Sequence, residues 1–435
     1  MTPDRSGDAD AAAAAQRSAP PALRRELGLL DAVGIGFGAI VGAGIFVVTG
    51  VAAGIAGPAF LIALLIAGVA ATANALSSAQ LAAEYPHAGG TYEYGYRVLH
   101  PWAGFAAGWM FLASKIAAAG TVALGLAGYL DALLPGLPPR GVAAGAILAF
   151  TMLNYVGVKR SSRANLAIVL VSIGALLLFV IAGAGTFDAD RLRPFAPAGV
   201  RGTLEASALL FFAYTGYARI ATLAEEVREP KRVIPRAIVL TIAGAVLLYA
   251  AVAVVAVGAL GADGMAAAAA PLHAAALAFP HAGVAPLVAL GGVAAMLGVI
   301  LSQLLGLSRM AFAMARRGDL PRVLEQIHPR YHVPGRAVVL VGAIAAIVAA
   351  TGTLRGVASA ASFTILVYYG IANVAALRMP REAKLYADAV PAVGLVCCTV
   401  LAMSLTPSVV LTGTAVLVVG LAVRAVLGRV VKRQV

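Results

Sequence analysis

Long apolar runs dominate the chain, and short charged or Pro- and Gly-containing segments separate them. A helix that crosses a bilayer needs about 20 mostly apolar residues, and most runs reach or approach this length. They are too long and too uniform in polarity for the alternating strands of about 10 residues that build membrane barrels. The pattern therefore predicts an all-α membrane protein with about twelve transmembrane helices. The predicted spans are 32–54, 58–82, 102–130, 141–157, 164–185, 204–223, 234–258, 284–313, 337–352, 357–377, 387–405 and 408–427.

The same pattern divides the chain into five parts. Residues 1–26 are rich in Ala, Pro and charge and contain no apolar h-region, so we predict a disordered cytoplasmic tail and no cleaved signal. Two blocks of five spans follow, at 27–185 and 204–377. After them come two accessory helices at 387–427 and a basic cytoplasmic tail at 428–435.

Composition and charge agree with this assignment. Hydrophobic residues make up 61% of the chain and charged residues 12%, whereas soluble domains carry about 25% charged residues. The net charge of +13 would suit nucleic acid, but most Lys and Arg fall in the loops that lie inside if the N-terminus is inside. The outside loops contain Arg140, Arg191, Arg193, Arg201 and Arg355. We therefore predict a multi-pass protein of the cell (inner) membrane, with both termini cytoplasmic, the lipid bilayer as partner and no nucleic acid.

Metal, redox and enzyme chemistry are not predicted. Cys397 and Cys398 are adjacent in a late apolar run, where neighbouring residues do not form an ordinary disulfide. The six histidines lie in loops or near span ends and lack zinc-ligand spacing. An intramembrane enzyme would need an HExxH motif or paired aspartates near the membrane face, and the sequence has neither. We expect no catalytic centre and no bound cofactor.

Two predicted spans contain polar or glycine-rich interruptions. The first span reads GAIVGAGIF at 38–46, and the sixth reads FFAYTGY at 211–217. Glycine weakens a helix by about 1 kcal/mol per residue relative to alanine, although small residues also let membrane helices pack closely. The interruptions lie five spans apart, and an odd separation reverses orientation, so the two halves would have inverted topology. Broken helices at matching positions of two halves point to a binding site at the membrane midplane.

Four stretches carry a family resemblance. They are GFGAIVGAGIFVVTG (36–50), AEYPHAGGTYEYGYR (83–97), FFAYTGYARIATLAEEVREPKRVIPRAI (211–238) and LGLSRMAFAMARRGDLP (305–321). With the helix count, the chain resembles the amino acid–polyamine–organocation (APC) superfamily of permeases over essentially residues 26 to 427. The resemblance implies a five-plus-five inverted-repeat (LeuT-like) fold followed by two extra helices, and transport of one substrate per cycle by alternating access.

An amino acid zwitterion suits two broken helices. Free N–H groups where the first helix unwinds can hold the carboxylate, because a half-helix N-terminus carries roughly +0.5 charge. Free carbonyls where the sixth helix unwinds can accept from the ammonium, and the resemblance implies the same use of both elements. By the resemblance, Phe212 matches the aromatic residue that gates the substrate. The predicted substrate-binding residues are Ile40, Gly42, Ala43, Gly44, Ile45, Phe211, Phe212, Tyr214, Thr215 and Gly216.

Three residues are candidates for ion coupling. Lys115 lies within the third span, where a charge costs about 2.5–3.5 kcal/mol on insertion scales and usually faces a cavity. It could carry a proton, replace a coupling Na⁺ as a fixed charge, or contact an acidic substrate side chain. Ser172 stands where the resemblance places a lysine in proton-coupled members, so coupling through a fifth-span lysine is not available. Ser302, in the eighth span, is either an oxygen ligand of a sodium-type site or a partner of its own helix.

The segment 84–100 is rich in tyrosine and glycine, and we interpret it as an interfacial segment that packs under the bundle and closes its inner side. The predicted function is a permease for amino acids or related amines, with H⁺-coupled uptake favoured. An exchanger, or a sensor or channel on the same fold, are the alternatives. Neither interruption contains an acidic residue, which disfavours cationic substrates. The sequence indicates no particular oligomeric state.

Overall fold

The computed structural model describes residues 27–85, 89–157, 162–217, 220 and 227–432. The predicted N-terminal tail, residues 1–26, therefore lies outside the described residues, as do 218–219 and 221–223 of the predicted sixth span. Within these residues all regular structure is helical, and one isolated parallel bridge joins Leu27 to Val227. The prediction of an all-helical chain is confirmed.

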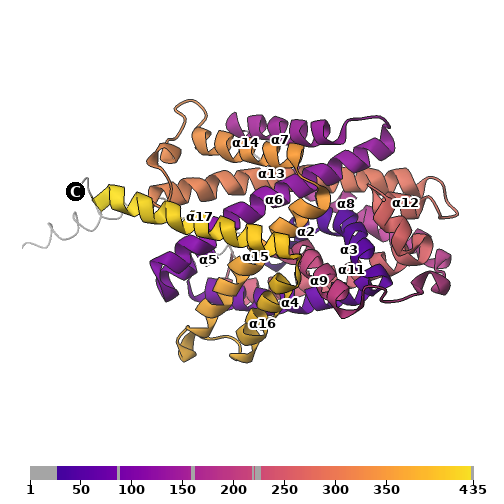
Figure 1. The fold of residues 1–435 in the computed structure, drawn as a ribbon, viewed down its shortest axis with the longest axis horizontal. Coiled ribbons are helices and arrows are strands. Elements are labelled where there is room, and N and C mark those ends of the chain that lie inside the picture. Colours follow the sequence, from indigo (N-terminus) through magenta and orange to yellow (C-terminus); the bar gives the residue numbers. More distant parts are fainter. Residues whose placement is uncertain (1–26, 86–88, 158–161, 218–219, 221–226, 433–435) are drawn as a thin grey trace, which may run out of the picture.

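Long helices, with shorter ones between them, build the structure (Figure 1). They are α2 (Leu29–Ile40), α3 (Thr49–Ala56), α4 (Phe60–Glu84), α5 (Thr91–Tyr94), α6 (Pro101–Leu133), α7 (Pro139–Tyr155), α8 (Ser162–Gly183), α9 (Gly199–Tyr214), α11 (Pro230–Ala267), α12 (Pro271–Ala276), α13 (Val284–Arg316), α14 (Gly335–Thr351), α15 (Leu354–Leu377), α16 (Ala389–Ser404) and α17 (Pro407–Lys432).

Each predicted span overlaps one or more of these helices. Among the described residues, seven helical segments are long and apolar enough to cross a membrane, which makes the chain a multi-pass membrane protein. They are Leu29–Glu84, Pro101–Leu133, Leu166–Thr186, Pro230–Ala267, Val284–Arg316, Leu354–Leu377 and Pro407–Leu427. The apolar helices Gly335–Thr351 and Ala389–Ser404 are shorter. The number of crossings stays a prediction.

Small residues face the interior and larger apolar residues face outward. On α4, Ala63 and Ala67 are completely buried, whereas Leu65 and Val69 are 51% and 59% exposed. A water-soluble helix shows the opposite arrangement, and small residues at helix contacts are typical of membrane bundles. The exposed leucines and valines therefore mark the face that contacts lipid.

The long helix α6 lies at the centre of the bundle. It packs against α13 and α15, and α7 and α14 lie together at one edge (Figure 1). The helix α4 packs against both α9 and α11. Of the two short helices of the first span, α3 contacts α4, α9 and α11, and α2 contacts α11. The accessory helices lie at the periphery, where α16 contacts α4 and α15 while α17 contacts α6 and α15. This arrangement brings the interruptions of the first and sixth spans together inside the bundle.

Candidate substrate site at two interrupted helices

The first interruption separates α2 from a new helix start. The helix α2 ends at Ile40 because Val41 adopts an extended backbone, with φ −71° and ψ 110°. Helical structure resumes as a π-helical turn at Gly44–Val48, with Ala43 at its N-cap. The first N–H groups of any helix lack intrahelical acceptors and carry partial positive charge. The structure thus places an N-terminal helix end at the glycine-rich motif.

The second interruption presents carbonyl groups. The helix α9 ends at Tyr214, and Thr215–Tyr217 continue as a tighter 3-10 turn. The Thr215 N–H and hydroxyl both donate to the Phe212 carbonyl, the hydroxyl at 3.0 Å. In an α-helix this N–H would bond to the carbonyl of Phe211. The Phe211 carbonyl therefore loses the Thr215 N–H as its α-helical donor.

The two interruptions touch each other directly. A Cβ atom placed on Gly44 would lie 2.4 Å from the Cα atom of Ala213. A Cβ atom on Gly216 would lie 2.2 Å from the Ala39 carbonyl oxygen and 2.5 Å from the Ile40 nitrogen. These distances are too short for any side chain, so the glycines are required for close approach of the two backbones. The donor end of one half-helix and the acceptor end of another lie side by side.

The structure brings the predicted substrate residues together around this contact. All ten are buried, apart from Gly216, which is half-buried. The ring of Tyr214 packs against Tyr249 of α11, and its hydroxyl donates to the Leu64 carbonyl of α4 at 3.3 Å. The side chain of Tyr214 is thus held by α4 and α11. Phe212 is 9% exposed, and its role as gate stays a prediction.

Three buried tyrosines that sequence reasoning missed donate to carbonyls at the interruptions. The Tyr249 hydroxyl lies 2.9 Å from the Ile40 carbonyl and 3.4 Å from that of Ala213, so it bridges both interruptions. Tyr129 of α6 donates to the Phe46 carbonyl at 2.8 Å. Tyr369 of α15 donates to the Thr215 carbonyl at 3.4 Å. A tyrosine hydroxyl in an apolar span needs a partner, and that was the available signal.

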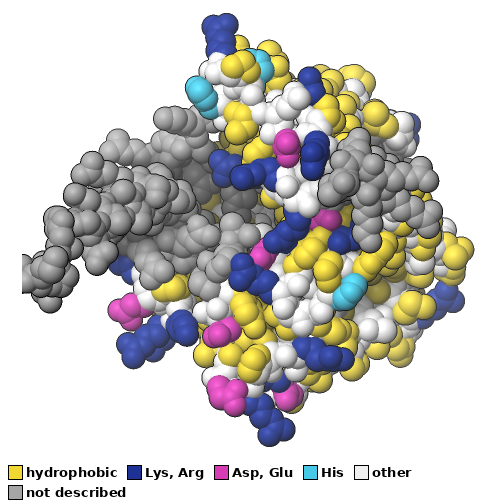
Figure 2. Space-filling view, turned by 90° about the vertical axis from the view of Figure 1, so that its left-hand side faces the viewer, with side chains coloured by type: hydrophobic (Ala, Val, Ile, Leu, Met, Phe, Trp, Pro, Cys, Tyr) yellow, Lys and Arg dark blue, Asp and Glu magenta, His cyan; other side chains and the backbone are white. Residues whose placement is uncertain are grey.

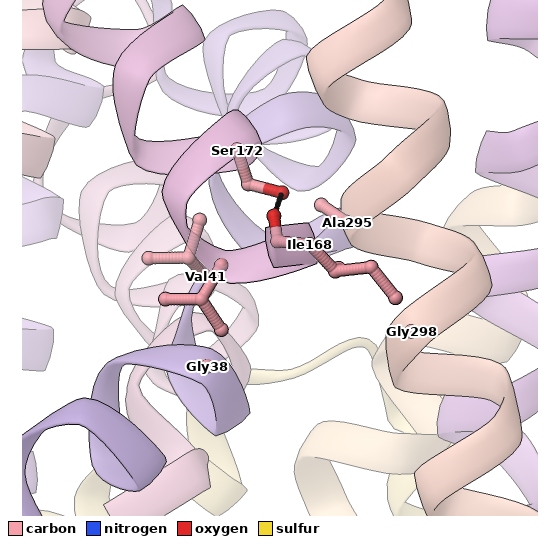
Figure 3. Close-up of a pocket in the computed structure, with 7 residues that line it drawn as sticks. Gly38, Val41, Ile168, Ser172, Ala295 and Gly298 are labelled. Atoms are coloured by element: carbon pink, nitrogen blue, oxygen red, sulfur yellow. Dashed lines mark hydrogen bonds between the residues drawn. The ribbon is translucent and has the colours of Figure 1, made fainter. Parts of the chain in front are cut away.

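A small cavity lies beside the first interruption (Figure 3). Its volume is about 10 Å³, roughly what one water molecule requires. The Ser172 hydroxyl donates to the Ile168 carbonyl at 2.7 Å and lies 3.4 Å from the Gly291 carbonyl. A serine therefore occupies the position where the resemblance places a lysine. The lining residues are Gly38, Val41, Ile168, Val169, Ser172, Ala295 and Gly298.

The other two coupling candidates occupy different environments. The Ser302 hydroxyl donates to the Val299 carbonyl of its own helix at 3.0 Å. Lys115 is half-buried on α6, with its ammonium 5.7 Å from the centre of the Phe111 ring. A ring face stabilises a cation in a poorly solvated place. Among the described residues no group of three or more His, Cys, Asp or Glu side chains could hold a metal ion.

Comparisons with known proteins identify the family of the chain. The sequence model of a family described as amino acid permease matches residues 31–428. An uncharacterized transporter of Mycobacterium tuberculosis is 44% identical over 408 residues, 93% of this chain and 92% of the relative. A branched-chain amino acid permease of Bacillus subtilis is 31% identical over 391 residues, 85% of this chain and 83% of the relative. A methylthioribose transporter of the same bacterium is 31% identical over 385 residues, 84% and 83% of the two chains. The chain belongs to the amino acid permease family of the APC superfamily.

Proposed function

We propose that this protein is a secondary transporter that binds an amino acid as a zwitterion between its two interrupted helices. The contact between Gly44 and Ala213 carries this proposal, because it sets the N-terminal end of one half-helix against the C-terminal end of α9, where the Phe211 carbonyl lacks the Thr215 N–H as donor. The α-carboxylate would accept from the N–H groups and the α-ammonium would donate to the carbonyl. Recognition of the part that all amino acids share then needs no charged side chain.

We further propose that transport follows alternating access between two inverted five-span repeats. The repeats are 27–185 and 204–377, with α16 and α17 as accessory helices, giving twelve crossings. The odd separation of the two interruptions supports this arrangement. Both termini would be cytoplasmic, which agrees with the many Lys and Arg side chains on the face seen in Figure 2, the end that carries α5 and the end of α17.

The proposed substrate is a neutral amino acid. The described residues of both interruptions contain no acidic side chain that would pair with a basic substrate. The Val299 side chain lies 2.9 Å from where a Cβ atom of Gly42 would be, which places an aliphatic group next to the first interruption. The name of the branched-chain amino acid permease among the relatives supports the same class.

We propose proton-coupled uptake, with Lys115 as the candidate coupling group. It is a half-buried titratable residue within a membrane-spanning helix, and such residues are usually functional. Exchange of one amino acid for another is a second candidate. The observation that favours exchange is Ser172, whose hydroxyl does not titrate in the range where a buried lysine would.

The test is uptake of a radiolabelled amino acid panel into proteoliposomes, with and without an inward proton gradient. We expect one or more amino acids to accumulate above equilibrium, with saturable kinetics, only when the gradient is present. Uptake that requires only internal amino acid would make the protein an exchanger, and non-saturable equilibration would make it a channel. If no amino acid moves under either condition, transport is refuted, and direct binding of the same panel then tests a sensor.

A further inference from the structure

A tyrosine-rich segment connects α4 to α6 at the end of the bundle that we propose to be cytoplasmic. It consists of α5 (Thr91–Tyr94) and a π-helical turn, Gly95–Leu99. The segment packs against α6 and α15. The Thr91 N–H donates to the Tyr368 hydroxyl of α15 at 3.2 Å. The next residue of α15 is Tyr369, whose hydroxyl donates to the Thr215 carbonyl at the second interruption. The segment is thus linked to the candidate site through α15.

A buried carboxylate holds this segment in place. Asp319 follows the end of α13, and its side chain is 6% exposed. It accepts hydrogen bonds from the Tyr92 hydroxyl at 2.7 Å and from the Tyr96 hydroxyl at 2.6 Å. Its third donor is Arg424 of α17, at 2.8 Å. We call Tyr92, Tyr96, Asp319 and Arg424 the inner clasp.

Arg424 connects an otherwise peripheral helix to the clasp. Most of α17 faces outward, since only 11% of its most apolar 18-residue stretch is buried. The Arg424 side chain, in contrast, is only 17% exposed. Besides Asp319, its guanidinium donates to the Tyr96 hydroxyl at 2.6 Å. It also lies 5.2 Å from the centre of the Trp102 ring and 5.1 Å from that of Phe105. Arginine suits such a place, because its planar group combines forked donors with stacking on rings.

A second charged pair reinforces the same segment. Glu93 lies 2.9 Å from Arg317 and 2.6 Å from Arg97. Burial raises the pKa of Glu93, but the hydrogen bond from Arg97 and the charge of Arg317 outweigh burial, so the net pKa is lowered. Burial raises the pKa of Tyr96 to about 12, so its hydroxyl keeps its proton and continues to donate to Asp319. At neutral pH segment 91–99 therefore carries an ionised Glu93 and a protonated Tyr96.

We propose that Arg424 is a positioning residue for transport, which acts through Asp319 to fix segment 91–99 and, through α15, the second interruption. On this view α17 is a working part of the transport cycle although none of its described residues belongs to the two interruptions. The inference rests on the proposed alternating-access function. Loss of the Arg424 charge would leave Asp319 buried without its cationic partner. An unpaired buried charge is strongly destabilising, so the contacts of Asp319 with segment 91–99 would weaken.

The first experiment is hydrogen–deuterium exchange of the full-length protein in nanodiscs, without substrate. In Arg424→Gln, peptides covering 91–99 should lose protection by about tenfold, the factor that corresponds to roughly 1.4 kcal/mol. The matched control is Arg355→Gln, which removes another arginine–carboxylate pair, with Glu205 at 2.7 Å, at the start of α15. The control should leave 91–99 unchanged. Unchanged exchange in Arg424→Gln, or equal loss in the control, would overturn the proposal.

The second experiment separates positioning from general stability. Arg424→Lys keeps the charge and should recover part of the protection and of the uptake rate. Asp319→Asn combined with Arg424→Gln should be less damaging than the sum of the two single changes, because both buried charges are then gone. Additive effects would contradict the clasp. If Arg424→Gln does not fold, Tyr96→Phe removes one hydroxyl that contacts both Asp319 and Arg424 and should give the same exchange result.

These readouts distinguish the clasp from the transport proposal. The hydrogen–deuterium exchange and the non-additivity of the double variant can match the expectation while the wild-type protein transports no amino acid. In that case the proposed function fails and the clasp itself remains. If the wild-type protein transports and Arg424→Gln transports at the same rate, the positioning role of Arg424 is refuted.

Discussion

Gly44 is the position where one added methyl group tests the site most directly. In Gly44→Ala the new Cβ atom would lie 2.4 Å from the Cα atom and 2.5 Å from the Cβ atom of Ala213. Ordinary van der Waals contact begins at 3.4 Å, so the two interruptions must separate by about 1 Å, a change in a packed core that costs about 1–3 kcal/mol. The obstacle includes backbone and therefore cannot be relieved by a side-chain rotation.

The separation should weaken substrate binding as well as folding. A zwitterion must reach the N–H groups of one interruption and the carbonyl of the other at the same time. Hydrogen bonds to charged groups contribute about 1.5–3 kcal/mol each, and 1.4 kcal/mol is a factor of ten in affinity. Loss of one such bond predicts a roughly 10- to 100-fold weaker substrate affinity in Gly44→Ala.

The assay is the concentration dependence of uptake in proteoliposomes, together with thermal unfolding of the purified protein. Gly34→Ala is the matched control, because it lies on α2 and a Cβ atom there meets nothing within 4 Å. It should transport normally and gain slightly in helix stability. Wild-type affinity in Gly44→Ala would refute the proposed site, and so would an equal loss of affinity in Gly34→Ala.

Three further changes test the surroundings of the site. Tyr249→Phe removes the hydroxyl that bridges the two interruptions and leaves two buried carbonyls without it, so transport should fall at least tenfold with a destabilisation of about 1–3 kcal/mol, read from uptake and thermal unfolding. Lys115→Ala should abolish the proton-gradient dependence of uptake, measured as accumulation at several external pH values. Glu93 has a lowered folded-state pKa, so its stabilising contribution is present above its ordinary pKa of 4.5 and is lost as the pH falls through the lower folded value. Thermal unfolding from pH 6 down to about 3 should show this loss in the wild type and a smaller loss in Glu93→Gln.

The tyrosine and lysine expectations each have a control on the same molecule. Tyr331→Phe alters a tyrosine outside the helices and should leave transport unchanged. Lys231→Ala removes an exposed lysine that lies 4.0 Å from Glu84 and should keep the gradient dependence. Transport at the wild-type level in Tyr249→Phe, unaltered pH dependence in Lys115→Ala, or identical acid profiles for Glu93→Gln and wild type would each contradict the corresponding argument.

The helices and the two interruptions could be predicted because each has a local cause. Apolar runs define where a helix must be buried or face lipid, and glycines at 42, 44 and 216 mark where a helix is weak. Helix ends were less predictable. The apolar pattern suggested a span ending near 258, but α11 continues to Ala267 with a non-helical residue at Gly261. The apolar pattern shows which residues are suited to a membrane-spanning helix, but it does not show where the backbone bends or where the helix ends.

The supporting residues could not be predicted, because their partners come from distant parts of the chain. Tyr249 lies 209 residues from Ile40, and although its hydroxyl signals the need for a partner, the run around it does not indicate which carbonyl that partner is. Arg424 lies 105 residues from Asp319 and 328 from Tyr96, and in sequence it looks like one of several basic residues near the C-terminal end of a span. Arg424 meets the buried carboxylate of Asp319 only when α6, α13 and α17 pack together.

This difference explains why the substrate class is easier to argue than its identity. In the proposed site, the main chain at the interruptions would bind a carboxylate and an ammonium, and the glycines at these interruptions are visible in the sequence. The substrate side chain would be selected by residues such as Val299, which reach the site from another helix. Two relatives with the same 31% identity are named for a branched-chain amino acid and for methylthioribose. A shared main-chain frame is therefore compatible with different ligands, and specificity must lie in side chains that the local motifs do not contain.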